Sequence, residues 1–313
     1  MYFSIVVPVY KCSQSIEELT QRLVNVLGKF GESYEIIFVD DHSPENDWEI
    51  ITHLSEKYAE VKGIQLSRNF GQHMAISAGL ENASGTWIIV MDGDLQDQPE
   101  EIVKLYTKAQ EGYDIVSARR ADRQDKKSKK TLSRFFYLLF GYLTDTKYDK
   151  TIANFGIYHK TVIQSILLMK DKVRVFPILL QWVGFKKTAI DVHHKARGKG
   201  ASSYNYRKLI QLAFEIIISF SNKPLSLMIR IGSSISITAF LIGIYYLVQY
   251  LGGNVLVSGY TSLIISIWFL AGVILSSLGI IGIYIGRIFD NTKDRPLYLI
   301  RTSVGEIKSQ NKI

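Results

Sequence analysis

The sequence predicts an α/β domain whose mostly parallel sheet carries helices on both faces, followed by two membrane-spanning helices. Short apolar, β-branched runs alternate with helix-period segments along residues 3–118. Two later apolar stretches, residues 227–251 and 260–285, each exceed the roughly 20 residues that a helix needs to cross a bilayer. We therefore expect a sheet domain over residues 1–222, the two spans within residues 223–289, and a tail over residues 290–313.

The predicted strands are short and mostly apolar, and residues 87–91 form a continuous apolar run, the pattern of a strand that is buried on both faces. They cover residues 3–10, 34–39, 61–66, 87–91 and 114–118, and the predicted helices cover residues 15–28, 48–58, 73–82 and 99–110. Strands separated by helices of this length pair in parallel, so their carboxyl ends lie at one edge of the sheet. Ligands of open α/β sheets bind at that edge.

The composition changes after residue 118. Residues 119–130 are rich in Arg and Lys and predict a surface loop. Aromatic residues are not interleaved there, so we expect anionic lipid headgroups rather than nucleic acid as its partner. The apolar segments at about 131–144 and 208–222 are too short to span a bilayer and predict helices at the membrane interface. A core helix is the alternative for the first.

The two long apolar stretches predict a membrane hairpin. Residues 227–251 contain one charge, Arg230, residues 260–285 contain none, and the connecting residues 252–259 are uncharged. Basic residues flank both outer ends, so we expect both termini in the cytoplasm and an inner or plasma membrane location. Two buried core helices are the alternative. The polar tail is expected to be cytoplasmic and partly flexible.

Charge and cysteine content narrow the class of protein. The 37 basic and 29 acidic residues give a net charge of +8, which favours an anionic partner. The single cysteine, Cys12, excludes an intramolecular disulfide and fits a reducing compartment. No set of Cys and His completes a zinc site, because the adjacent His193 and His194 point to opposite faces of a strand.

An acidic turn follows the predicted strand at residues 87–91. Asp92, Asp94 and Gln96 provide hard oxygen ligands, which suit Mg²⁺ or Mn²⁺ and hence a diphosphate. Gly93 is expected to let the backbone turn sharply. A solvated strand-to-helix turn is the alternative. Two further turns, residues 8–10 and 40–43, follow strands that a parallel sheet brings alongside, and their carboxylates could bind a base and a ribose.

Several motifs occur in a fixed order along almost the whole chain. They are the acidic turn with its strand, Ser67-Arg68-Asn69-Phe70-Gly71-Gln72-His73, Trp182-Val183-Gly184-Phe185, Arg197-Gly198-Lys199-Gly200 and Phe220-Ser221-Asn222-Lys223-Pro224-Leu225. With the two membrane spans, this set resembles the inverting family-2 glycosyltransferases with a GT-A fold. It resembles most their polyprenyl-phosphate branch, which includes dolichyl-phosphate mannose synthases and the bactoprenol glucosyltransferases of O-antigen modification.

The resemblance implies a donor, an acceptor and a set of site residues. The donor would be a nucleotide sugar, in the first place a UDP-sugar such as UDP-glucose, and the acceptor undecaprenyl or another polyprenyl phosphate. The lipid-linked product would serve cell-surface glycan synthesis. A divalent cation, Mg²⁺ or Mn²⁺, would lie at Asp92, Asp94 and Gln96. The nucleotide sugar would contact Pro8, Tyr10, Asp40, Asp41, Ser43, Asn69, Gly71, Asp92 and Gln96, and the catalytic residues would be Asp94, Asp149, Asn154, Arg119, Arg134 and Arg197.

The chain departs from the pattern of that branch at several positions. Lys11-Cys12 stands where relatives often have Asn-Glu, and Ser203 replaces a common lysine. Asn154 stands where many bactoprenol glucosyltransferases have Asp, so either Asn154 or nearby Asp149 serves the acceptor side. Two other functions stay open: transfer to a growing polysaccharide, and a catalytically impaired membrane adaptor. Hairpins of this kind also often pack with copies of themselves, so a homo-oligomer is possible.

Overall fold

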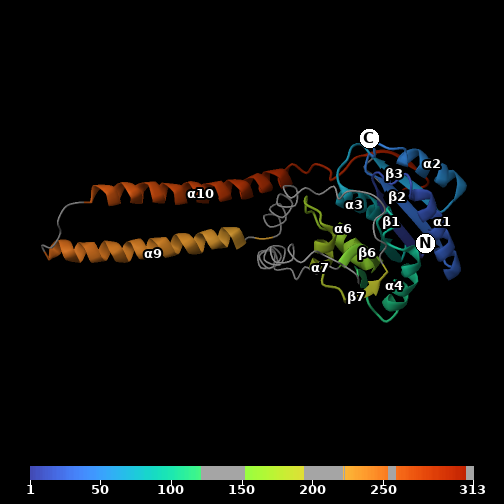
Figure 1. The fold of residues 1–313 in the computed structure, drawn as a ribbon, viewed down its shortest axis with the longest axis horizontal. Coiled ribbons are helices and arrows are strands. Elements are labelled where there is room, and N and C mark those ends of the chain that lie inside the picture. The colour runs from blue at the N-terminus through green and yellow to red at the C-terminus, as the bar shows by residue number, and fades with distance from the viewer. Residues whose placement is uncertain (121–151, 194–220, 222, 253–258, 308–313) are drawn as a thin grey trace. The chain divides into compact units, whose positions relative to one another are not determined.

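The computed structural model describes residues 1–120, 152–193, 221, 223–252 and 259–307 (Figure 1). These residues form two compact units. The sheet unit contains residues 1–120, 152–193 and 295–307, and the helical unit contains residues 221, 223–252 and 259–294. The interfacial helices predicted at 131–144 and 208–222 lie outside the described residues, apart from Ser221.

The described residues of the sheet unit form an eight-stranded sheet in the order β7-β5-β6-β4-β1-β2-β3-β8. β6 runs antiparallel to β4 and β5, β8 runs antiparallel to β3, and the other pairings are parallel. This mixed sheet confirms the predicted GT-A-like fold. The strands are β1 (Phe3–Val9), β2 (Tyr34–Asp40), β3 (Val61–Leu66), β4 (Trp87–Val90), β5 (Ile115–Arg120), β6 (Ile152–His159), β7 (Lys187–Val192) and β8 (Ile300–Val304).

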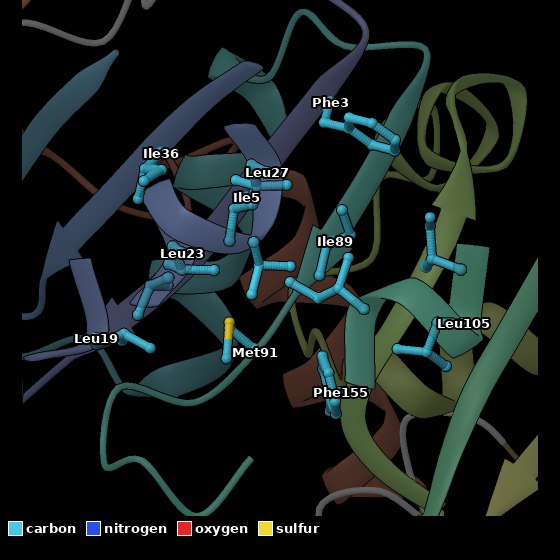
Figure 2. Close-up of a cluster of buried hydrophobic side chains, with 14 of the residues drawn as sticks. Phe3, Ile5, Leu19, Leu23, Leu27, Ile36, Ile89, Met91, Leu105 and Phe155 are labelled. Carbon is cyan, nitrogen blue, oxygen red and sulfur yellow. The ribbon is translucent and has the colours of Figure 1, made fainter. Parts of the chain in front are cut away.

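Helices cover both faces of the sheet. On one face, α1 (Ile16–Leu27), α2 (Asp47–Lys57) and α4 (Ile102–Ala109) pack against alternate residues of the central strands. Figure 2 shows this cluster, with Leu19, Leu23 and Leu27 of α1 directed towards the strands. On the other face, α3 (Gln72–Asn82) packs on β1, β2 and β3. The remaining helices of this unit are η1 (Gly28–Phe30), η2 (Pro99–Glu101), α6 (Lys160–Leu167) and α7 (Phe176–Trp182).

A buried carboxylate joins the strands at the edge of the sheet opposite the acidic turn. Glu35 is fully buried, and its Oε1 accepts hydrogen bonds from the Ser4 hydroxyl (2.6 Å) and from the hydroxyl and backbone N–H of Ser84 (2.6 and 2.7 Å). Its Oε2 accepts a bond from Lys62 Nζ at 2.8 Å. Burial acts to raise the pKa of Glu35, but the Lys62 ammonium and the serine donors together lower it.

Part of the polar C-terminal tail forms the edge strand β8, which the sequence did not predict. Tyr298 and Ile300 are fully buried against β2, β3 and α3, and the Tyr298 hydroxyl donates to Glu81 Oε2. The backbone N–H of Ser67 donates to Leu299 O at 2.9 Å. The chain therefore returns to the sheet unit after the second long helix, and this part of the tail, which was predicted to be polar and partly flexible, forms a strand.

The helical unit contains two long helices, α9 (Lys223–Leu251) and α10 (Tyr260–Thr292), which lie side by side (Figure 1). Among the described residues, Lys223–Tyr245 and Ser266–Thr292 are long and apolar enough to cross a membrane. Large apolar side chains such as Phe240 and Trp268 are 69% and 76% exposed, so protein does not cover them as it would in a core. The Tyr284 hydroxyl donates to Ser221 O at 2.7 Å, which places the start of α9 beside the last turns of α10.

Candidate active site

The acidic turn begins where β4 ends, at the carboxyl edge of the parallel strands. Asp92, Asp94 and Gln96 are half-buried there. Gly93 is needed for a reason other than the predicted sharp turn: a Cβ at Gly93 would lie 3.3 Å from Pro8 O and 3.4 Å from Val7 Cγ1. The left-handed residue of the turn is Leu95, with φ 59°. Gly93 therefore lets the turn pack closely on the end of β1.

Hydrogen bonds fix the shape of the acidic turn. Asp94 Oδ1 accepts the backbone N–H of Gln96 at 3.2 Å, which closes the turn on itself. Asp92 Oδ1 accepts a bond from Gln72 Nε2 at 2.7 Å, and the Ser15 hydroxyl donates to Gly93 O at 2.6 Å. Gln72 and Ser15 were not among the predicted site residues. Only the three-dimensional arrangement brings the starts of α3 and α1 to this turn.

Two buried carboxylates lie where β2 ends, Asp40 as its last residue and Asp41 as the first residue after it. Asp40 accepts the Ser43 backbone N–H at 2.8 Å and Gln65 Nε2 at 3.0 Å. Asp41 accepts the backbone N–H groups of Phe70 and Gly71 at 2.7 and 2.9 Å. Burial raises the pKa of both carboxyls. Asp41 thus shapes the loop that contains Asn69 and Gly71, two of the residues predicted to contact the nucleotide sugar.

The residues after β1 connect these turns. Pro8 is buried in the strand, while Tyr10 is 44% exposed at its end. The Cys12 backbone N–H donates at 3.1 Å to Asp47, a fully buried carboxylate that the sequence analysis missed. Burial raises the pKa of the Cys12 thiol to about 11, and nearby carboxylates act in the same direction. At neutral pH this thiol is protonated and is a poor nucleophile.

The loop before α3 connects the acidic turn with the end of β2, because Asp41 binds the loop and Gln72 binds Asp92. Gly71 adopts φ 97°, a conformation that disfavours side chains, and Asn69 is exposed. The imidazole of His73 follows in the first turn of α3. Burial lowers its pKa to about 4, so His73 is neutral at physiological pH. Its Nδ1 has no hydrogen-bond partner among the described residues.

The acceptor-side predictions fall partly outside the described residues, which exclude Asp149, Arg134 and Arg197. Asn154 lies in β6, whose register pairs Gly156 with Val90, so the residues before Gly156 run towards the acidic turn. Arg119 lies near the carboxyl end of β5. Its Nε is 3.6 Å from Asp191 Oδ1 of β7. The sheet thus places Arg119 and Asn154 towards the same edge as Asp92.

The side-chain oxygens of the acidic turn are suitable ligands for a hard divalent cation. No three His, Cys, Asp or Glu side chains of the described residues are grouped to hold a metal ion. The predicted set instead has two carboxylates, Asp92 and Asp94, and the amide oxygen of Gln96. Mg²⁺ is commonly held by one or two carboxylates together with substrate phosphates, which is the set that this turn and a diphosphate would form.

Comparisons with known proteins identify the family of the chain. Residues 4–169 match the model of the family described as "Glycosyl transferase family 2". The chain is 38% identical over 304 residues to the uncharacterized glycosyltransferase YkcC of Bacillus subtilis, covering 97% of this chain and 94% of that protein. It is 34% identical over 320 residues to the undecaprenyl-phosphate 4-deoxy-4-formamido-L-arabinose transferase of Yersinia enterocolitica, covering 98% and 95%.

Among solved structures, a partial match is S. aureus TarS 1–349 in complex with UDP-GlcNAc. The TM-score is 0.45 at 19% identity, covering 70% of this chain and 66% of that one. The family model and the full-length relatives carry the assignment. The chain belongs to glycosyl transferase family 2 and is a glycosyltransferase.

Proposed function

We propose that this enzyme transfers one sugar from a nucleotide sugar to a polyprenyl phosphate at the membrane surface. The observation that carries the proposal is the acidic turn at the carboxyl edge of the sheet, in a chain that also has two helices of membrane-spanning length. The relatives named as undecaprenyl-phosphate transferases are 32–34% identical over nearly the whole chain, which supports a prenyl phosphate as acceptor.

The turns after β1, β2 and β4 would form the binding site of the nucleotide sugar. Asp40, with its neighbours Tyr10 and Ser43, would bind the nucleoside, and the loop held by Asp41 would contact the nucleotide sugar through Asn69 and Gly71. Asp92, Asp94 and Gln96 would hold Mg²⁺ or Mn²⁺ against the diphosphate. When bound, the cation would stabilise the charge that develops on the departing nucleoside diphosphate. A UDP-sugar such as UDP-glucose is the first donor to test.

The acceptor phosphate needs positively charged side chains to hold it more than it needs a general base. A phosphate monoester is already anionic at neutral pH, so its oxygen can attack the anomeric carbon without a strong general base. Attack from the face opposite the leaving group inverts the configuration. Arg119 would orient the acceptor phosphate, and the resemblance assigns Arg134 and Arg197 the same role, because guanidinium groups bind phosphate in a fixed bidentate geometry. Asn154 or Asp149 would complete this side.

The two long helices would anchor the enzyme beside its lipid substrate. The contact between Tyr284 and Ser221 brings the start of α9 next to the last part of α10, as in a hairpin whose ends lie on one side of the bilayer. Lys223, Arg287 and Lys293 flank those ends and favour the cytoplasmic side. The basic residues 119–130 would then face anionic headgroups. The sheet domain would comprise residues 1–222 together with the returning strand β8.

A transfer assay tests the proposal. The full-length enzyme in detergent is incubated with undecaprenyl phosphate, Mn²⁺ or Mg²⁺, and radiolabelled UDP- and GDP-sugars offered one at a time. We expect label in the organic extract with at least one donor, and none when EDTA is present. Absence of lipid-extractable label with every donor would contradict the proposed acceptor and reaction.

A further inference from the structure

Ser15 occupies the N-cap position of α1 without capping the helix. A serine in this position normally accepts a hydrogen bond from a backbone N–H of the first helical turn. Ser15 makes no such bond, and its backbone has φ −114° and ψ −19°. Its hydroxyl is instead within hydrogen-bond distance of two backbone carbonyls outside α1. The chain thus lacks a local stabilising interaction at this serine.

The hydroxyl of Ser15 reaches the acidic turn. Its Oγ lies 2.6 Å from Gly93 O and 2.9 Å from Cys12 O, and the shorter contact crosses from α1 to the turn after β4. The Gly93 carbonyl belongs to the peptide plane that joins Gly93 to Asp94. Because a peptide unit is planar, a bond that fixes this carbonyl also fixes the backbone N–H of Asp94 and its Cα, the atom from which the side chain starts.

The loop that carries Ser15 is itself held in place. The backbone N–H of Lys11 donates to Ser43 Oγ at 3.1 Å, and that of Cys12 donates to Asp47 Oδ2 at 3.1 Å. Lys11 adopts a left-handed conformation with φ 58°, which these contacts maintain. The loop after β1 is therefore tied to the loop after β2, and Ser15 extends this connection to the acidic turn.

We infer that Ser15 is a positioning residue for the carboxylate of Asp94, acting through the Gly93 carbonyl. The inference rests on the proposed function, in which Asp92 and Asp94 hold a divalent cation. Side chains that hydrogen-bond to metal ligands and orient them contribute strongly to metal affinity. Their removal typically weakens metal binding about 10- to 100-fold. Ser15 acts on the backbone rather than on the ligand atom, so its removal should weaken binding about tenfold, the lower end of that range.

Cation affinity provides the test. Mn²⁺ is titrated into the full-length enzyme in detergent at a fixed concentration of UDP, and free Mn²⁺ is followed by its electron paramagnetic resonance signal. We expect Ser15→Ala to raise the Kd for Mn²⁺ about tenfold, while Ser15→Thr, which keeps the hydroxyl, stays close to wild type. Tm should fall by no more than about 2–4 °C, because one hydrogen bond to the turn is lost while α1 loses no cap. Ser15→Gly, which suits an N-cap, repeats the test if the alanine variant folds poorly.

Ser13→Ala is the matched control. Ser13 lies in the same loop, and its hydroxyl donates to Glu45 Oε2 at 2.7 Å rather than to the acidic turn. It should bind Mn²⁺ like wild type. If Ser15→Ala and Ser15→Gly also bind like wild type, the positioning role of Ser15 is wrong. If the wild-type enzyme itself binds no Mn²⁺ with UDP, the proposed cation site fails, and the role of Ser15 fails with it.

Discussion

Replacing Glu35 by Gln tests how the strands of the sheet are joined. The substitution keeps the shape of the side chain and an oxygen that can accept the three bonds from Ser4 and Ser84. It removes the negative charge that faces Lys62 Nζ at 2.8 Å. The amide NH₂ group would then lie against an ammonium that keeps only 18% of its side-chain exposure. The variant therefore leaves a largely buried cation without its partner.

The size of the effect follows from this burial. Removing one partner of a fully buried ion pair costs about 3–5 kcal/mol, whereas an exposed pair contributes about 0–1 kcal/mol. Glu35 is fully buried and Lys62 is partly screened by solvent, so we expect a loss of about 2–4 kcal/mol. For a domain of this size, each kcal/mol lowers Tm by about 2–4 °C. The predicted fall in Tm is roughly 5–15 °C.

The assay is thermal unfolding of the full-length protein in detergent at several pH values. The pKa of Glu35 is lowered in the folded state. Its stabilisation is therefore fully present above the unfolded-state pKa of about 4.3 and is lost as the pH falls through the folded value. The gap in Tm between wild type and Glu35→Gln should be constant near neutral pH and should close in acid.

Glu111→Gln is the matched control. Glu111 makes an even shorter ion pair, 2.6 Å to Lys108 Nζ, but both side chains are substantially exposed, at 54% and 32%. We expect no measurable change in Tm. A fall for Glu111→Gln as large as that for Glu35→Gln would refute the reasoning from burial. So would a Tm gap for Glu35→Gln that widens as the pH falls.

Three further outcomes are expected. Gly79→Ala should lower Tm, because the new Cβ would lie 2.3 Å from Val6 Cγ1, and such overpacking costs about 1–3 kcal/mol. Tyr298→Phe should lower the free energy of unfolding by about 1 kcal/mol through loss of its bond to Glu81, measured by thermal unfolding. Asp94→Ala should lower the transfer rate about 100-fold or more, measured as lipid-extractable label, with the protein still folded.

Each of these outcomes has a result that would count against it. An unchanged Tm in Gly79→Ala would mean that β1 and α3 can separate at no cost. Wild-type stability in Tyr298→Phe would leave the docking of the C-terminal segment to apolar contacts alone. Full turnover in Asp94→Ala would show that the cation, if bound, lies elsewhere.

The sequence predicted the strands that carry continuous apolar runs and missed those that do not. β1, β2 and β4 could be predicted because almost all of their residues are apolar and buried on both faces, and β3 and β5 because most of their residues are apolar. β6 contains Asn154 and Gly156, and β8 contains Arg301 and Thr302, so neither shows a plain apolar pattern. Both run antiparallel to their neighbours, and β8 pairs with a strand more than 230 residues earlier in the chain. That pairing depends on the folded sheet and leaves no local signal.

The candidate site could likewise be predicted from the sequence only in part. Asp92 and Asp94 follow a recognisable strand, so their place at the sheet edge could be predicted. Gly93 was correctly singled out, but its role is a close approach to Pro8, which only the packing of two strands reveals. Ser15 and Gln72 resemble ordinary helix starts in the sequence. Their contacts with the acidic turn cross 78 and 20 positions of the chain.

The mass of the lipid product tests the central claim most directly. The enzyme is incubated with undecaprenyl phosphate, Mn²⁺ and the donor that gives extractable label, and the lipid fraction is measured by mass spectrometry. We predict one new species, the mass of undecaprenyl phosphate plus a single sugar residue. Sugar found only in a growing polysaccharide, or a lipid fraction that stays unmodified while the nucleotide sugar is consumed, would contradict the account.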